Sequence, residues 1–150
     1  MNTETASPRT ETNQQPKKSF MRFIPACARI LLGLPLVIFG LNGFFNFIPP
    51  PPTPLPEKAM AFAGALMESG YMLQLIGATM LISGVLLLIN RFVPLALLLM
   101  APFFVNSLAF HLCLERSGLP MAVIFLALEL YLAWVYRKTY QPLFVARPAR

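Results

Sequence analysis

Residues 71–114 decide the fold, and they read YMLQLIGATMLISGVLLLINRFVPLALLLMAPFFVNSLAFHLCL. This stretch consists of two apolar runs, 71–89 and 92–114, and only Asn90 and Arg91 separate them. The hydrocarbon core of a bilayer is about 30 Å thick, and a helix needs roughly 20 apolar residues to cross it. Each run has that length. The stretch therefore predicts two membrane-spanning helices that pack as a tight antiparallel hairpin.

Two further apolar runs lie on either side of this hairpin, at 23–48 and 119–136. A short polar turn, 115–118, joins the last run to the hairpin, and Pro102 predicts a kink because it removes a backbone donor. The composition agrees, since 57% of the residues are hydrophobic and only 12% are charged. We therefore predict an all-α membrane protein, with a four-transmembrane-helix bundle over 23–140.

A proline-rich segment interrupts the chain between the first two runs. Six of the eight residues 49–56 are proline, which favours an extended polyproline II conformation. If 57–89 formed a single helix, it would be about 50 Å long, well beyond the bilayer core. We therefore predict a break near Ser69 and Gly70, with a short interfacial or re-entrant helix before it.

The two ends of the chain are polar and predict cytoplasmic tails. Residues 1–22 lack an apolar core with a cleavage site, so we expect a disordered tail and no cleaved signal peptide. Residues 141–150 predict a basic tail. With both termini inside, Lys58 and Arg116 are the only basic residues that lie outside, as the positive-inside rule favours. The basic residues on the cytoplasmic side are then Arg9, Lys17, Lys18, Arg22, Arg91, Arg137, Lys138, Arg147 and Arg150.

Two charged residues lie inside apolar runs. Arg29 is near the inner end of the first span, and Glu129 is at a similar depth in the fourth. An ionisable group inside the bilayer costs about 2.5 to 3.5 kcal/mol on insertion scales, so it needs a partner. We predict a structural ion pair between them. A proton-relay or ligand-binding role is the alternative.

A second polar group lies toward the predicted outer face. Its members come from the end of the first span, the start of the second and one stripe of the third, and we predict that they line one outward-facing pocket. As candidate ligand-binding residues they are Asn42, Asn46, Glu68, Tyr71, Ser107, His111 and Glu115.

His111 is the only histidine, so the chain cannot supply two histidine ligands to a haem or a histidine-rich metal site. Two interpretations of its role are open. His111 is either an interhelical hydrogen-bonding residue, or a residue that exchanges protons or holds a polar ligand such as a quinone carbonyl. No catalytic residue and no metal ligand are predicted.

Other residue patterns exclude several classes. Cys27 and Cys113 fall at opposite ends of their spans, so they cannot form a disulfide with each other. The net charge of +6 does not indicate nucleic-acid binding, because the basic residues sit at the ends of apolar runs. Glycines recur on the first two spans and predict close helix packing without a phosphate-binding loop; they are Gly33, Gly40, Gly43, Gly77 and Gly84.

The order of these features resembles the DoxX-like family of small integral membrane proteins. The resemblance covers 23–140 and rests on short motifs, which are RILLG at 29–33, LNGFF at 41–45, SGYM at 69–72, NRFVPL at 90–95 and FHL at 110–112. It implies a four-helix membrane bundle. It also implies a link to redox chemistry, because the founding members are small subunits linked to quinone-reducing or quinol-oxidising complexes.

These observations lead to one expected function and two alternatives. We expect an accessory subunit or partner of a membrane oxidoreductase, in the bacterial cytoplasmic (inner) membrane, with quinone bound through a partner or in the outer pocket. It would not be catalytic by itself. The alternatives are a small oligomeric transporter or permeability factor, in which the same polar residues line a pathway, and a purely structural membrane protein.

Overall fold

The computed structural model describes residues 23–49, 52 and 54–144. The predicted tail 1–22, most of the predicted tail 141–150 and part of the polyproline segment lie outside the described residues. Within the described part, the chain forms six α-helices and one 3-10 helix and has no strand. The predicted all-α class is therefore confirmed for these residues.

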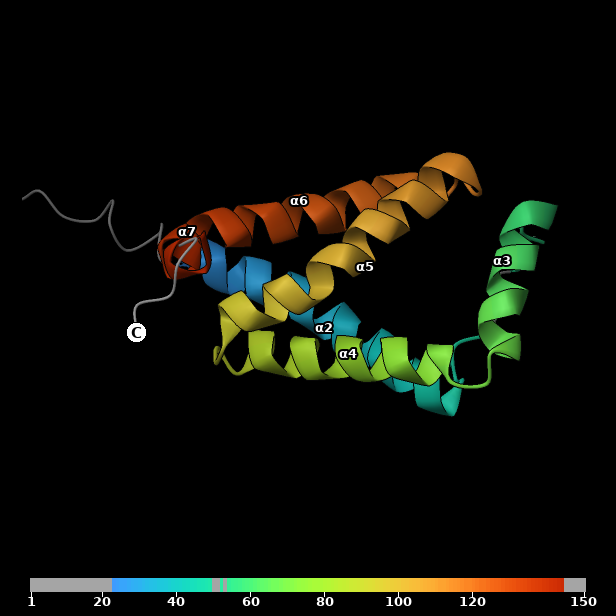
Figure 1. Cartoon of the computed structure of the whole chain (residues 1–150), viewed down its shortest axis with the longest axis horizontal. Coiled ribbons are helices and arrows are strands. Elements are labelled where there is room, and N and C mark those ends of the chain that lie inside the picture. Colours follow the sequence, from blue (N-terminus) through green and yellow to red (C-terminus); the bar gives the residue numbers. More distant parts are fainter. Residues whose placement is uncertain (1–22, 50–51, 53, 145–150) are drawn as a thin grey trace, which may run out of the picture.

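Four long helices run alternately in opposite directions, and the third of them crosses obliquely between the second and the fourth (Figure 1). Each of them falls within one of the four apolar runs. They are α2 (Phe23–Phe45), α4 (Met72–Leu88), α5 (Val93–Cys113) and α6 (Leu119–Val135). α5 continues unbroken through Pro102. α2 ends three residues before the end of its apolar run, because Asn46 adopts a φ of 47° and the Asn42 side-chain oxygen accepts a hydrogen bond from the Ile48 N–H at 2.7 Å.

The helices are apolar on their outer surfaces as well as in the interior. Leu31, Ile82, Val105 and Leu130, one from each long helix, are each at least 56% exposed. Large apolar side chains spread over every outer face are unfavourable in water and favourable in lipid. The apolar outer surface therefore supports the prediction of a membrane protein.

Two helices, α2 and α5, are each long and apolar enough to cross a bilayer. The number rises to four if each of two bent pairs counts as one span: α3 (Glu57–Glu68) with α4, and α6 with the following Arg137–Leu143. α4 and α6 have 17 residues each, about 25 Å of helix, at the lower end of the usual range for a span. The described residues thus define two to four candidate spans.

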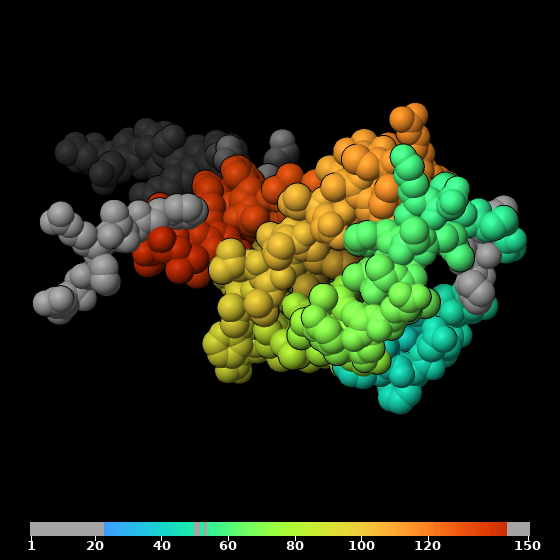
Figure 2. Space-filling view, turned by 45° about the vertical axis from the view of Figure 1, so that its right-hand side comes forward, coloured from blue at the N-terminus to red at the C-terminus, as the bar shows by residue number. Residues whose placement is uncertain are grey.

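The predicted break near Ser69 and Gly70 is confirmed. α3 ends at Glu68, and the chain bends by 89° before α4 begins at Met72. Gly70 has a φ of +74°, a conformation that glycine adopts without strain, and the Ser69 hydroxyl accepts the Met72 N–H at 3.1 Å. α3 then lies against the end of α5 (Figure 2). The rings of Phe62 and Phe110 are 5.6 Å apart at this contact.

Glycines hold α2 and α4 together, as their spacing predicts. A Cβ atom on Gly40 would lie 2.7 Å from the backbone nitrogen of Leu81, and one on Gly84 would lie 2.8 Å from the Gly33 carbonyl oxygen. The two backbones are therefore in direct contact. Apolar side chains from all four long helices fill the rest of the core, among them Leu32, Leu87, Leu97, Met100 and Leu132.

Helical structure continues beyond residue 136, the end of the last apolar run. Helical structure continues through α7 (Arg137–Tyr140) into the 3-10 helix η1 (Gln141–Phe144). The Tyr140 hydroxyl donates a hydrogen bond to the Pro94 carbonyl at 3.1 Å, which ties α7 to the start of α5. This contact between distant residues explains why order extends beyond the last apolar run.

Candidate functional site

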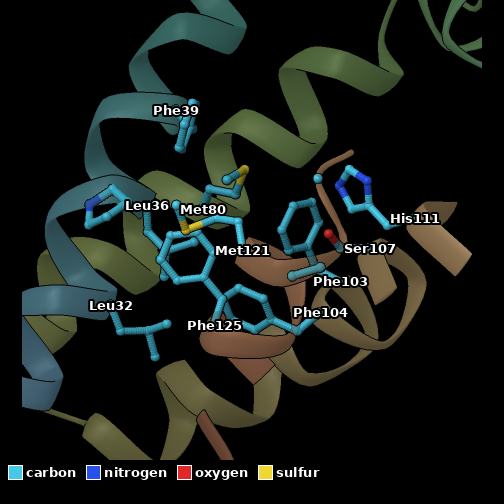
Figure 3. Close-up of a pocket in the computed structure, with 13 residues that line it drawn as sticks. Leu32, Leu36, Phe39, Met80, Phe103, Phe104, Ser107, His111, Met121 and Phe125 are labelled. Atoms are coloured by element: carbon cyan, nitrogen blue, oxygen red, sulfur yellow. The ribbon is translucent and has the colours of Figure 1, made fainter. Parts of the chain in front are cut away.

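A cavity of about 470 Å³ lies among α2, α4, α5 and α6. Its size falls within the range of small-molecule pockets. Its walls are apolar except for two side chains, Ser107 and His111 (Figure 3). The apolar lining consists of Leu32, Pro35, Leu36, Phe39, Met80, Phe103, Phe104, Met121, Ala122 and Phe125, with Gly118 beside His111.

Aromatic rings form the middle of this pocket. The ring of Phe104 is 5.5 Å from that of Phe103, in an edge-to-face arrangement, and 6.2 Å from that of Phe125 on α6. Leu32 on α2 is fully buried at the apolar end, and His111 and Ser107 lie on the other side of the rings (Figure 3). The pocket thus has an apolar end, an aromatic middle and a polar end.

The polar end is built from one turn of α5 and the turn that follows it. His111 lies four residues after Ser107, so both side chains emerge on the same face of the helix. The Nδ1 atom of His111 is 3.0 Å from the Glu115 carbonyl oxygen and 3.0 Å from the Glu115 Oε2 atom. A carbonyl and a carboxylate only accept hydrogen bonds, so Nδ1 is the donor and Nε2 is left for a ligand.

Glu115 fixes this arrangement from the turn between α5 and α6. Its carboxylate accepts hydrogen bonds from the backbone N–H groups of Ser117, at 2.6 Å, and Gly118, at 3.1 Å. Hydrogen bonds from Ser117, joined by those from Gly118 and His111, lower the pKa of Glu115 from 4.5 to about 2, against the opposing effect of desolvation. Glu115 is therefore ionised, and its carboxylate orients His111. Glu115 does not line the pocket itself.

Gly118 is a site residue that the sequence reasoning missed. A Cβ atom at this position would lie 2.6 Å from Nδ1 and 2.8 Å from Nε2 of His111, so only glycine leaves room for the ring. The phenylalanine walls were also missed. The sequence gives little indication of which phenylalanines line a pocket, because it has 13 of them and most would face lipid or core in any bundle.

The predicted outer pocket is corrected in its membership. Of the seven candidates, Ser107 and His111 line the pocket and Glu115 contacts His111, whereas the other four do not line it. Asn42 caps the end of α2, and Asn46 is exposed just beyond it. Glu68 and Tyr71 are exposed on either side of the 89° bend, so the bend separates them from the bundle interior.

The predicted ion pair between Arg29 and Glu129 is also corrected. Among the described residues, Arg29 and Glu129 form no ion pair. Nε and Nη1 of Arg29 and both carboxylate oxygens of Glu129 are buried without a hydrogen-bond partner. Similar depth in two helices is thus not enough to bring the two groups together: Glu129 lies on α6, where part of the residue lines a separate cavity formed with α5 and α7, and Arg29 lies on α2.

Fold and site together define a class: an all-α protein with two to four candidate membrane spans and an internal apolar pocket that ends in a histidine held by a glutamate. No group of three or more His, Cys, Asp or Glu side chains that would hold a metal ion occurs in the described part of the chain. Comparison with protein-family models, curated proteins and solved structures found no match for this chain.

Proposed function

We propose that the chain is a DoxX-like membrane protein with four spans, located in the bacterial cytoplasmic membrane with both termini inside. The support is the order of its short motifs, the apolar outer surface of all four long helices and the distribution of basic residues. In this orientation the polar end of the pocket lies toward the outer face.

We further propose that the pocket binds a quinone or quinol, and that the protein acts as an accessory subunit of a quinone-linked oxidoreductase. The observation that carries this proposal is the order of the pocket lining, from apolar through aromatic to polar. A quinone has the same order, with an apolar tail and a flat ring that ends in a carbonyl. The partner enzyme would supply the electrons, and this chain would hold the ligand.

The polar end suits both redox forms of such a ligand. With Nδ1 of His111 engaged by Glu115, a neutral imidazole offers the Nε2 lone pair to a quinol hydroxyl. A protonated imidazole offers an Nε2–H to a quinone carbonyl. The Ser107 hydroxyl is able to donate to one form and to accept from the other.

The test is ligand binding by the protein in lipid nanodiscs, with decylubiquinone and its quinol as probes and empty nanodiscs as the blank. We expect saturable binding that His111→Gln and Ser107→Ala each weaken by about 2- to 10-fold, the effect of losing one hydrogen bond. Asn106→Ala is the matched control, because Asn106 adjoins Ser107 on α5 but does not line the pocket. Absence of saturable binding by the wild-type protein would refute the binding proposal.

The accessory role has its own test. The protein, purified from native membranes in mild detergent, should carry quinone and an oxidoreductase partner in a reproducible ratio. A protein that is reproducibly alone, while still binding decylubiquinone, would retain the ligand proposal and rule out the partner.

A further inference from the structure

A second cavity, of about 330 Å³, lies between α5 and α6 on the side of the bundle where α7 begins. It shares no lining residue with the pocket that contains His111. Leu98, Val105 and Leu130 line it and are each more than half exposed, so it is a groove that opens on the outer surface. Its walls are aliphatic and include Leu98, Ala101 and Val105 of α5 and Leu126, Leu130 and Ala133 of α6. An aliphatic groove on the outer surface of a membrane helix pair faces lipid chains.

One end of this groove is polar. The chain bends by 74° between α6 and Arg137–Leu143, and the Tyr140 hydroxyl donates to the Pro94 carbonyl at 3.1 Å, so α7 lies against the start of α5. Arg137 and Tyr140 line the groove at this end. Trp134, one turn earlier, is 62% exposed, and exposed tryptophan is typical of the boundary between lipid chains and headgroups. The polar end of the groove therefore lies at the level of the headgroups.

The guanidinium of Arg137 is held at this end by Trp134. Its Nη1 atom donates to the Trp134 carbonyl at 3.0 Å, and the guanidinium carbon lies 4.6 Å from the centre of the Trp134 ring. A guanidinium has five N–H donors, so this bond leaves further donors for a ligand. Arginine pairs especially well with phosphate, through two parallel hydrogen bonds.

The charges around this end of the bundle favour an anion. Lys138 adjoins Arg137, and Arg91 lies in the turn before α5; both are exposed. Glu129 also borders the groove, but both of its carboxylate oxygens are buried and do not face it. The other acidic residues of the described part lie on α3 and in the turn after α5, at the opposite end of the bundle (Figure 1); they are Glu57, Glu68 and Glu115. The polar end of the groove therefore attracts negative charge.

We propose that this groove binds an anionic phospholipid, whose phosphate contacts Arg137 while one acyl chain lies between α5 and α6. Basic pockets between membrane helices bind anionic lipid headgroups in other membrane proteins. The aliphatic walls match the chain, and the free donors of Arg137 match the phosphate. The proposal requires a membrane location but neither quinone binding nor a partner enzyme, so its failure would leave the proposed quinone site untouched.

Native mass spectrometry of the delipidated full chain in detergent measures this binding directly. The probes are dioleoylphosphatidylglycerol and dioleoylphosphatidylcholine, which carry the same chains and a phosphate but differ in net charge. We expect one phosphatidylglycerol bound per chain, about tenfold more tightly than phosphatidylcholine, as a charge-assisted hydrogen bond would give. Inorganic phosphate at the same concentration should not displace the lipid, because it has no chain to fill the groove.

Two pairs of variants test the two parts of the site. Arg137→Gln should abolish the preference for the anionic lipid, whereas Lys138→Gln, which removes the same charge next to the groove but not in it, should retain the preference. Ala133→Leu narrows the groove and should weaken phosphatidylglycerol binding, whereas Ala127→Leu, at an exposed position of α6 outside the groove, should not. Equal affinity of the wild-type protein for the two lipids would overturn the proposal. So would displacement by inorganic phosphate, or equal effects of the two variants in either pair.

Discussion

At the residue scale, the polar end of the first pocket depends on the fit between Gly118 and His111. A methyl group at Gly118 would lie 2.8 Å from Nε2, the atom that we propose contacts the ligand. Gly118→Ala should therefore move the imidazole and weaken decylubiquinone binding several-fold. Because the ring lies at the end of the bundle, the melting temperature should change little.

A double-mutant cycle separates this effect from a general loosening of the turn. If Gly118→Ala acts through the imidazole, it should have no further effect on binding in a His111→Gln background. Additive losses in the double variant would mean that Gly118 acts independently of the histidine, and the positioning role would be wrong.

Glu115 gives a prediction about acid stability. Its pKa is lowered from 4.5 to about 2 in the folded protein. The Glu115 carboxylate is therefore ionised in the folded protein at pH values where the same group is protonated in the unfolded chain. A lowered pKa contributes stability that is fully present above the unfolded value and is lost as the pH falls toward the folded value. The stability difference between wild type and Glu115→Gln should therefore shrink between about pH 5 and about pH 2.

Thermal unfolding in detergent over that range measures this difference. A difference that stays constant with pH would show that the hydrogen bonds from Ser117 and Gly118 do not stabilise the charged form.

At the scale of elements, the contact between α2 and α4 is set by backbone approach. A Cβ at Gly40 would meet backbone atoms of Leu81 and Gly77 at 2.7 to 2.9 Å, and backbone cannot move aside as a flexible side chain does. Gly40→Ala should force the helices apart and destabilise the protein by about 1 to 3 kcal/mol, the usual cost of overpacking. Unfolding in detergent measures the loss.

The matched control for this change is Gly64→Ala on α3. A Cβ there meets nothing within 4 Å, and alanine favours the helix over glycine. The control should be neutral or slightly stabilising. Equal destabilisation by the two variants would contradict the close packing of α2 on α4.

The elements were predictable to within a few residues, and the site was only partly so. Apolar run length, the glycines at Gly33, Gly40 and Gly84 and the break at Gly70 are local signals, and the helices follow them. Pocket membership depends instead on which way a helix turns after a bend. The bend of 89° after α3 takes Glu68 out of the bundle, and no local pattern gives that angle.

Glu129 shows the same limit of sequence-based prediction: a contact that was predicted is not formed. Counting residues from the ends of the two spans places Glu129 and Arg29 at a similar depth in the membrane. This similar depth was the reason for predicting that they pair. Whether two helices face each other at that depth depends on their rotation about their own axes. In the described structure both carboxylate oxygens of Glu129, and Nε and Nη1 of Arg29, are buried without a hydrogen-bond partner.

At the scale of the whole molecule, the number of spans decides on which side of the membrane each turn and each pocket lies. α4 and α6 are short, so the described helices fit from two spans, with α2 and α5 alone crossing the bilayer, up to four. The two arrangements differ at two exposed turn residues, Asn90 before α5 and Ser117 before α6. With the amino terminus inside, four spans put Asn90 inside and Ser117 outside, whereas two spans reverse both.

Single cysteines at these two positions therefore distinguish the arrangements without reference to the site. The background is Cys27→Ser with Cys113→Ser, which removes both native thiols. A membrane-impermeant maleimide added to intact spheroplasts should label Ser117→Cys and leave Asn90→Cys unlabelled until the membrane is opened. Four spans require this result, because an odd number of crossings separates the amino terminus from Ser117 and an even number separates it from Asn90. The opposite labelling pattern would show that α4 does not cross, and the His111 pocket would then lack the outward orientation that the proposed quinone site assumes.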